Sequence, residues 1–283
     1  MNFIKATLLL FIIVFTSCAE KKVPEDNAKI MSYNIRLNIA SDGENAWPNR
    51  KEFLTSQVLF FAPDVLGVQE ALPGQMKDLD TLLTDYNFIG KARDGVDKGE
   101  YSAIFYNKKT VSVEKDNTFW LSETPDELSQ GWDGACRRVC TYGLFTLKST
   151  KEKFWVFNTH LDHVGKVAQK KGLKLILDKV KSVNTENLPV FITGDFNVEP
   201  NSDAIAQTKV DFYDSKEIAD IIFGPEGTFT GFKYDEPVKR RIDHILVSKN
   251  PKVNVEKYAI FSSSVNFKFP SDHFPVFIEA ELK

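Results

Sequence analysis

The chain has 283 residues and a formal net charge of −3 at pH 7. A mildly acidic chain is poorly suited to broad, unspecific binding of nucleic-acid backbones, which carry a dense negative charge. Hydrophobic residues make up 42% of the sequence and include 23 phenylalanines, enough for one large domain with a substantial core.

The first residues, 1–17, are predicted to be a signal peptide and not part of the fold. Lys5 supplies a positive flank, and the apolar run Leu8–Phe15 is too short for a membrane span. The run leads into Thr-Ser-Cys18, which resembles the lipobox of bacterial lipoproteins, with Cys18 as the lipidated residue. An ordinary secretory signal cut nearby and an uncleaved anchor are the alternatives.

Cleavage before Cys18 would leave residues 18–28 as a polar tether and residues 29–283 as the folded domain. An acyl group on Cys18 would hold an exported bacterial protein on the periplasmic or cell-surface side of a membrane. Such an anchor attaches the protein to the membrane without making its substrate a lipid. Loss of Lys5 with the signal peptide would make the mature chain one charge more negative.

Cys136 and Cys140 are the two cysteines that remain if Cys18 is lipidated. On a strand they would lie about 13 Å apart, too far for a disulfide, whereas a helix or turn would let them meet. We expect two buried free thiols, and oxidation in an exported protein is the alternative.

The first third of the domain is predicted to alternate strands with helices. Asn49 and Glu52 have the spacing of a capping box, and a helix follows them until Pro63 stops it. Another helix is expected around residues 76–83. The strands of this part are expected at residues 29–37, 65–68 and 88–91.

Strands predominate after Tyr101, and one long helix is predicted over residues 167–183. Residues 190–192 have the composition of a short strand that is buried on both faces. The mixture is neither a pure βαβ alternation nor all-β, so it predicts an α/β fold with two packed sheets and helices outside them. The other strands are expected at residues 102–106, 111–119, 142–147, 154–160, 242–247, 253–260 and 274–280.

Polar side chains collect where these apolar strands end. Asp195 and Asn197 follow the strand at 190–192, and side chains at i and i+2 of an extended chain share one face. Glu70 follows the strand at 65–68 in the same way. All four histidines fall in such stretches, which scattered core or surface histidines would rarely do. The remaining candidates are Asn34, Asn158, His160, His163, Asp243, His244, Asp272 and His273.

Carboxylate and amide oxygens predominate among these groups. They are hard ligands that suit Mg²⁺, with Mn²⁺ as a substitute ion. The sequence has no P-loop, no His-Glu-x-x-His and no Gly-x-Ser-x-Gly, so a P-loop NTPase, a zincin or an esterase elbow is unsupported. His160 and His163 have the spacing of half a zinc site, but cysteine partners are absent from their surroundings in the sequence.

Six stretches of the chain occur in an order that is known from one superfamily. They are Met31-Ser-Tyr-Asn34, Val68-Gln-Glu70, Asn158-Thr-His160, Gly194-Asp-Phe-Asn197, Arg241-Ile-Asp-His244 and Ser271-Asp-His273. From residue 28 to 283 the chain resembles the endonuclease/exonuclease/phosphatase superfamily, and six motifs in order make the resemblance specific. Trp47-Pro-Asn-Arg50 and residues 119–125 look like a bacterial branch known only broadly as hydrolases. The resemblance implies a DNase I-like fold, a four-layer α/β sandwich.

The resemblance further implies a hydrolase that cleaves phosphate esters by in-line attack of an activated water. Glu70 would bind the metal with help from Asn34 and Asp272, and the metal would polarise a phosphoryl oxygen. Asp195 would orient and deprotonate the attacking water, with Asn197 as its positioning partner.

Two histidines are expected to act on the phosphate itself. By the same resemblance, His273 would hydrogen-bond the scissile phosphate while Asp243 holds its tautomer and charge. His160 would contact a second phosphoryl oxygen. His163 and His244 neighbour motif residues, and a supporting or packing role is at least as well founded for them.

The chain departs from several relatives that place a tyrosine against the phosphate, because no tyrosine aligns securely here. Arg137 or Arg138 is the candidate replacement, since an arginine clamps phosphate well. A solvated arginine pair is the alternative. Arg93 follows a predicted strand and is a weaker candidate for substrate binding.

Two alternatives to a hydrolase of small phosphate esters stay open. One is a nuclease acting on DNA or RNA, against which the acidic charge argues mildly. The other is a catalytically inert, surface-binding lipoprotein on the same fold, against which the complete set of expected polar residues argues. We expect a monomer whose partners are a phosphate-ester substrate and, through the lipid anchor alone, a membrane.

Overall fold

The computed structural model describes residues 27–283. The predicted signal peptide, Cys18 and all but the last two residues of the predicted tether lie outside the described residues. Among the helices of residues 27–283, none is long and apolar enough to cross a membrane.

Strands supply most of the regular structure. They are β1 (Asn27–Asn34), β2 (Val65–Ala71), β3 (Tyr86–Ile89), β4 (Tyr101–Asn107), β5 (Val111–Trp120), β6 (Val139–Leu147), β7 (Lys153–His160), β8 (Val190–Asp195), β9 (Phe212–Asp214), β10 (Ile221–Phe223), β11 (Asp243–Ser248), β12 (Val253–Ile260) and β13 (Val276–Leu282). Their order is β10-β12-β13-β1-β2-β4-β3 in a seven-stranded sheet and β5-β6-β7-β8-β11-β9 in a six-stranded sheet.

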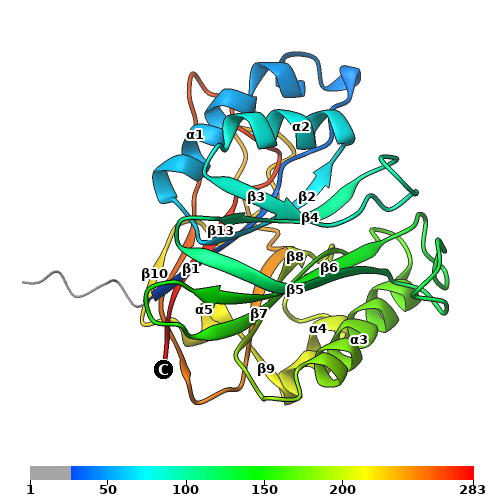
Figure 1. Cartoon of the computed structure of the whole chain (residues 1–283). Helices are drawn as coiled ribbons and strands as arrows, with labels where there is room; N and C mark the ends of the chain where they lie inside the picture. The colour runs from blue at the N-terminus through cyan, green and yellow to red at the C-terminus, as the bar shows by residue number, and fades with distance from the viewer. Residues whose placement is uncertain (1–26) are drawn as a thin grey trace, which may run out of the picture.

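Helices cover the outer faces of both sheets. They are α1 (Lys51–Phe61), α2 (Pro73–Leu82), α3 (Lys166–Val183), α4 (Asp203–Ala206) and α5 (Ser215–Ile218), with 3₁₀ turns at Ala40–Asn45, Trp47–Asn49 and Gln207–Val210. Figure 1 shows α1 and α2 on one side, the two sheets in the middle, and α3 and α4 on the other side. The expected four-layer α/β sandwich is confirmed.

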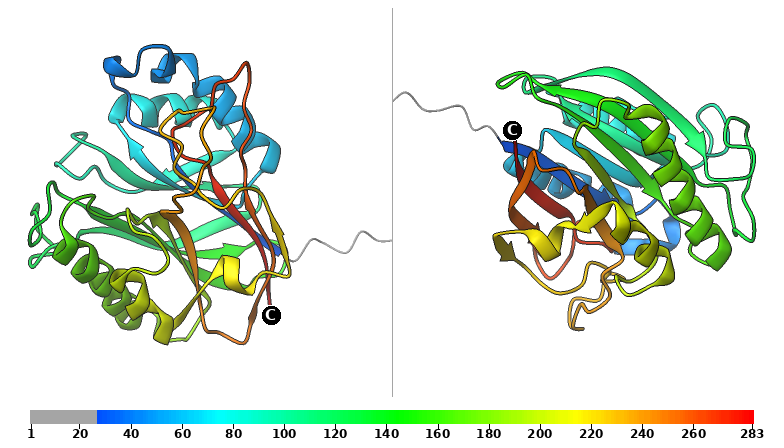
Figure 2. Two further views of the ribbon diagram at one scale, coloured as in Figure 1. Left: turned by 180° about the vertical axis from the view of Figure 1, so that it is seen from behind. Right: turned by 90° about the horizontal axis from the view of Figure 1, so that it is seen from below.

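The register of the strands decides which side chains meet. β1 runs parallel to β2, and β7 runs parallel to β8 with His160 opposite Asp195. β11 runs antiparallel to β8, so it begins where β8 ends, with Asp243 beside Asp195. The last strand, β13, pairs antiparallel with β1, and Figure 2 shows the two side by side. The carboxyl ends of several strands therefore meet at one edge of the sandwich.

Three apolar clusters hold the layers together. Phe145 and Phe191 are buried in the cluster between the two sheets. Leu173 of α3 packs on the outer face of the six-stranded sheet, and Leu54 and Leu79 of α1 and α2 pack on the seven-stranded sheet. Each fully buried side chain of this kind contributes about 1.5–3 kcal/mol, so the sheets form a firm platform for the edge where they end.

A polar bridge crosses between the sheets beneath that edge. Asn158 of β7 donates through Nδ2 to the carbonyl oxygens of Val68 (2.9 Å) and Ala103 (2.8 Å). Its Oδ1 accepts from Gln69 Nε2 (2.7 Å) and Thr193 Oγ1 (3.0 Å). Asn158 is fully buried and lies beneath the strand ends, so it ties the two sheets together and does not face substrate.

Some element boundaries differ from the prediction. The capping box is wrong: Asn49 lies in a 3₁₀ turn and donates to the carbonyl oxygen of Glu44, and Arg50 precedes α1 without a side-chain cap. β1 begins two residues earlier than expected. β13 begins only at Val276, because Pro275 has no N–H with which to donate a hydrogen bond to a neighbouring strand. The three-residue strands β9 and β10 are too short to produce a periodic signal.

Candidate active site

The candidate site lies where β1, β2, β7 and β8 end and β11 begins. These elements bring Asn34, Glu70, His160, Asp195 and Asp243 to one edge, as the strand-end pattern predicts. The two parallel pairs are responsible, because parallel strands end on the same side of a sheet.

Asp195 is the centre of the site and is only 1% exposed. Its Oδ1 accepts a hydrogen bond from the backbone N–H of Asn197 (2.9 Å), and its Oδ2 accepts from Asn34 Nδ2 (3.0 Å). His160 Nε2 and His273 Nε2 lie 3.4 Å and 3.8 Å from the same Oδ2. The carboxylate is therefore held from the backbone side, and two imidazoles face its other oxygen.

Glu70 is held by neighbours on both of its carboxylate oxygens. Oε1 accepts from Asn34 Nδ2 (2.9 Å), and Oε2 accepts from the backbone N–H of Leu37 (3.0 Å). The register of β2 against β4 shifts between Val68 and Ala71, and Glu70 has a φ of +64° in that irregularity. A left-handed backbone at a bulged strand end is costly for a residue other than glycine, and such strain is characteristic of functional positions.

His273 and Asp243 form a buried pair. His273 Nδ1 lies 2.8 Å from Asp243 Oδ2, and Asp243 is fully buried. Because the carboxylate accepts from Nδ1–H, the ring presents Nε2 toward Asp195. In this arrangement Asp243 holds the orientation of the His273 ring.

His160 and Asn197 form a second pair. Asn197 Nδ2 lies 2.9 Å from His160 Nε2 and 3.1 Å from the carbonyl oxygen of Leu161. An amide nitrogen can only donate, so Nε2 of His160 accepts and the ring proton sits on Nδ1. That Nδ1 is buried without a hydrogen-bond partner, and its nearest ionic neighbour is Glu100 Oε2 at 3.7 Å. His160 therefore holds one unused donor that faces away from Asp195.

The electrostatics give the three central groups different protonation states. Burial, followed by the negative charge of Asp243, raises the pKa of Asp195 to about 7. Burial alone would lower the pKa of His273, but Asp243 and Asp195 outweigh it and hold this pKa well above its usual range. Burial, with Arg138 second, holds the pKa of His160 well below its usual range. Near neutral pH, His273 is an imidazolium and His160 is neutral.

The residues around Asp195 fit a divalent cation. The ligand atoms of Glu70, Asp195 and His273 all lie within 4.8 Å of one another. His273 is protonated and pairs with Asp243, so the two carboxylates are the ligands that this arrangement offers. Carboxylate oxygens match Mg²⁺ and Mn²⁺.

Asn34 and Asp272, the two predicted auxiliary ligands, are placed differently from each other. Asn34 turns its amide nitrogen to both carboxylates, and its Oδ1 accepts from the backbone N–H of Arg36 (3.0 Å). This arrangement makes Asn34 a residue that holds Glu70 and Asp195 together and does not support it as a direct ligand. Asp272 Oδ2 lies 3.9 Å from Arg36 Nε, and burial raises its pKa.

The predicted arginines separate into two groups. Arg93 forms a two-pronged ion pair with Glu100, and Arg138 Nη1 lies 3.6 Å from the same carboxylate. Arg137 instead pairs with Asp94 nearer the surface (3.2 Å). Through Glu100, Arg93 and Arg138 border the site on the His160 side, and Arg137 does not.

Glu100 and Arg50 are the main residues that the sequence did not reveal. Glu100 precedes a strand, whereas the polar groups that the sequence pattern singles out follow strands. Arg50 is buried and donates to the carbonyl oxygens of Ile35, Arg36, Asn45 and Pro270, which fixes the loops beside Glu70 and Asp272. Its only sequence signal is its place in Trp47-Pro-Asn-Arg50.

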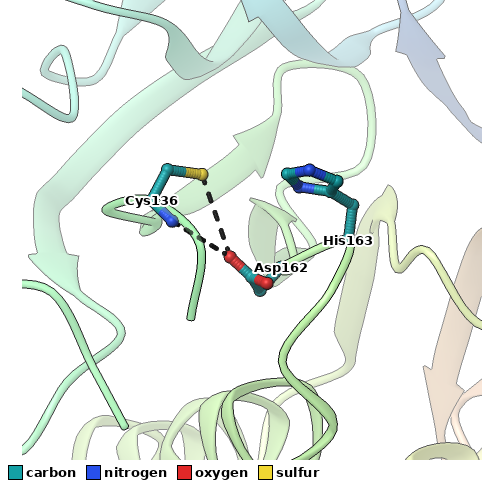
Figure 3. A group of neighbouring side chains, drawn as sticks. All are labelled: Cys136, Asp162 and His163. Atoms are coloured by element: carbon teal, nitrogen blue, oxygen red, sulfur yellow. Dashed lines mark hydrogen bonds between the residues drawn. The ribbon is translucent and has the colours of Figure 1, made fainter. Parts of the chain in front are cut away.

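A second cluster lies beside the site but is not arranged as a metal centre. Cys136, Asp162 and His163 converge in Figure 3, and Cys136 Sγ is 3.8 Å from Asp162 Oδ2. Both oxygens of Asp162 already accept backbone N–H bonds, from Ala135 and Cys136 on one side and Val164 and Gly165 on the other. Asp162 therefore fastens two loops together.

Cys136 and Cys140 are free thiols, as expected, but only Cys140 is buried as predicted, and Cys136 is half-buried. Burial raises the pKa of both thiols. Among the described residues, neither group of His, Cys, Asp and Glu that could hold a metal contains His160 together with His163. The half zinc site considered from the sequence is therefore not assembled.

Two other residues of the motif stretches stay outside the site. His244 is fully buried and lies 2.9 Å through Nε2 from the carbonyl oxygen of Val198. Arg241 forms a buried two-pronged ion pair with Asp214 (2.6 and 3.1 Å). Both support the loops behind Asp195 and do not contact the edge where the strands end.

Comparison with known proteins places this geometry among phosphoester hydrolases. A family model described as the Endonuclease/Exonuclease/phosphatase family matches residues 31–273. A crystal structure of a protein of that family from Bacteroides thetaiotaomicron is similar at 36% identity and a TM-score of 0.85, covering 90% of this chain and 97% of that one.

Two further solved structures are similar to this chain. A mannosyl-6-phosphatase from B. thetaiotaomicron VPI-5482 is 37% identical, with a TM-score of 0.85 over 89% of this chain and 99% of that one. The human nocturnin catalytic domain is only 17% identical, with a TM-score of 0.70 over 91% of this chain and 94% of that one, so it supports the fold alone.

Proposed function

The chain belongs to the endonuclease/exonuclease/phosphatase family, and we propose that it is a magnesium-dependent hydrolase of phosphate esters. One observation carries the proposal: buried Asp195 lies beside the carboxylate of Glu70 and the imidazolium of His273, with ligand atoms within 4.8 Å. A base, a metal-binding carboxylate and a cation that face one point are what water attack on a phosphate ester requires.

Each residue of the site has its own role in the proposed reaction. Asp195 accepts a proton from the attacking water, because its raised pKa makes it a better base than an ordinary aspartate. His273, kept charged by Asp243, donates from Nε2 to a phosphoryl oxygen. Glu70 would hold the cation, with Asn34 positioning Glu70 against Asp195. When bound, the cation neutralises negative charge on the phosphoryl group and the leaving oxygen.

We favour a phosphatase over a nuclease. The mannosyl-6-phosphatase is 37% identical to this chain over 89% of its length, and a net charge of −3 does not favour a long nucleic acid. The inert-lipoprotein alternative is weakened because every residue of the predicted catalytic set, namely Asp195, His273, His160, Asp243 and Asn197, is brought together at one edge.

A substrate panel tests the proposal with the mature chain. It contains p-nitrophenyl phosphate, bis-p-nitrophenyl phosphate, sugar phosphates, phosphoinositides, sphingomyelin and single- and double-stranded nucleic acids, each with Mg²⁺ or with chelator. We expect hydrolysis of phosphate monoesters that stops in chelator and in Asp195→Ala. Hydrolysis of none of these esters would overturn the proposal in favour of an inert protein, and exclusive cleavage of nucleic acids would replace it with a nuclease.

We also propose that Cys18 carries a lipid anchor, on the strength of the lipobox-like Thr-Ser-Cys18 after an apolar run. Cys18→Ala should move the protein from the membrane fraction to the soluble fraction. A Cys18→Ala protein that still sediments with membranes would show that something else attaches it.

A further inference from the structure

The Arg93–Glu100–Arg138 cluster is not used by the proposed chemistry. Glu100 immediately precedes β4, at the end of the loop that begins at Arg93, and its side chain is 14% exposed. Arg93 saturates one side of the carboxylate, with Nη1 2.8 Å from Oε2 and Nη2 2.8 Å from Oε1. The charge of Arg93 is therefore already neutralised, which leaves it poorly suited to bind a phosphate.

The other side of Glu100 is incompletely bonded. Arg138 Nη1 lies 3.6 Å and His160 Nδ1 lies 3.7 Å from Oε2, both too far for hydrogen bonds. Arg138 Nε and His160 Nδ1 are buried without hydrogen-bond partners, and the two residues are only 7% and 6% exposed. The two buried donors thus lack partners beside Glu100 Oε2, which accepts from Arg93 Nη1 and has a lone pair left to accept one more hydrogen bond.

The chemistry of this point selects one kind of group. A group placed there must accept from Arg138 or His160 and donate to Glu100 Oε2, and an alcohol hydroxyl does both. An ionised second phosphate or carboxylate could accept from the donors, but it has no proton to donate to Glu100 Oε2. An alkyl chain would leave the two buried donors unsatisfied, at a cost that strongly disfavours such a substrate.

We propose that Glu100, with Arg138 and His160, forms a subsite for a hydroxyl group on the leaving alcohol, so that the enzyme selects polyol monophosphates such as sugar phosphates. The subsite adjoins the reaction centre because His160 also faces Asp195, 3.4 Å from Nε2 to Oδ2. This inference rests on the proposed phosphatase function. It makes Glu100 a residue that determines specificity and takes no part in bond cleavage.

Two esters with leaving groups of equal length give the sharpest test. Hexose 6-phosphate carries several hydroxyls on its leaving alcohol, and n-hexyl phosphate carries none on its alkyl chain. Both are primary alkyl esters, so their ratio of kcat/KM reports recognition of the hydroxyls. We expect the wild-type ratio to favour the hexose phosphate by at least about 10-fold, most of it in KM.

Glu100→Gln keeps the size of the side chain but removes its charge and places an amide beside the arginines. It should lower the hexose-to-hexyl ratio by about 10-fold or more. Glu127→Gln, in an exposed neighbouring loop, is the matched control and should leave the ratio unchanged. Thermal melts confirm that both variants are folded, and the ratio itself does not depend on the fraction of active enzyme.

The outcomes separate the two proposals. Equal wild-type kcat/KM for the two esters, or a ratio that Glu100→Gln leaves unchanged, overturns the hydroxyl subsite while the hydrolase stands. A preference for a hexose bisphosphate over the monophosphate also overturns it, in favour of an anion subsite. Hydrolysis of neither ester nor p-nitrophenyl phosphate overturns the hydrolase and, with it, the subsite.

Discussion

At the scale of one residue, the buried carboxylate of Asp195 lowers the stability of the fold at neutral pH. In the unfolded chain an aspartate ionises near 3.8, but in the fold burial and Asp243 raise its pKa to about 7. Between these values the folded chain binds a proton that the unfolded chain releases, so rising pH destabilises the fold. The site therefore keeps a base that is unfavourable for stability at neutral pH.

Asp195→Asn should abolish activity and stabilise the metal-free chain. The asparagine has no proton to lose. The melting temperature of the variant should therefore rise relative to that of the wild type as the pH increases from 5 to 8. For a domain of this size, each 1 kcal/mol corresponds to about 2–4 °C. Calorimetry in chelator measures the difference. Asp126→Asn, at an exposed position in a loop, is the control and should have the same melting temperature as wild type at each pH. A difference in melting temperature between Asp195→Asn and wild type that is the same at every pH would contradict the explanation.

Asp243 acts on both neighbours in the same direction. Its negative charge raises the pKa of Asp195 and the pKa of His273. Activity needs Asp195 deprotonated and His273 protonated, which predicts a bell-shaped pH profile. Asp243→Asn should move both limbs of that profile to lower pH.

The same variant should also lower the maximal rate by about 10²-fold or more, because His273 loses the negative charge that keeps it protonated. The measurement is kcat/KM for p-nitrophenyl phosphate between pH 5 and 10. Asp116→Asn, on an exposed part of β5, serves as the control. If both limbs of the pH profile stay in place in Asp243→Asn, groups other than Asp195 and His273 cause them.

At the scale of secondary-structure elements, Asn158 connects the two sheets through hydrogen bonds. It meets two carbonyl oxygens and two donors from the facing sheet and from its neighbour β8, and a Cβ on Gly67 would lie only 2.5 Å from its Oδ1. Asn158→Ala should destabilise the fold by about 2–4 kcal/mol, since it leaves a cavity and buried polar groups without partners. Urea unfolding measures this loss.

Asn87→Ala provides the comparison for that measurement. Asn87 lies on the exposed face of β3, where a substitution changes stability by less than about 0.5 kcal/mol. A similar small loss for Asn158→Ala would show that its four hydrogen bonds contribute little net stability.

The elements also show how far sequence reasoning reaches. Apolar strands that end in Glu70, His160 and Asp195 are visible in the sequence, because burial on both faces leaves an unbroken apolar run. Glu100 and Arg50 are not visible, since their roles come from loops folded back on distant strands. The tautomer of His160 and the inward turn of the Asn34 amide also depend on such contacts, which no local pattern encodes.

At the scale of the whole molecule, β1 links the start of the described chain to the site. It runs from Asn27 to Asn34, and eight residues of extended chain span about 23 Å. If Cys18 carries the proposed anchor, the chain leaves the membrane side at Asn27, and the site lies at the far end of β1. The site would then lie at the end of the domain opposite the point where the tether enters it.

This orientation predicts a substrate that is dissolved and not a lipid of the same bilayer. The lipidated full chain on vesicles and its Cys18→Ala form in solution should hydrolyse a water-soluble phosphate monoester with the same kcat/KM, because the anchor neither covers nor completes the site. Vesicles that contain phosphoinositides provide the opposing substrate. Faster release of phosphate from those lipids by the anchored chain than by the Cys18→Ala form would contradict the orientation, since only a site turned toward the bilayer gains from attachment to it.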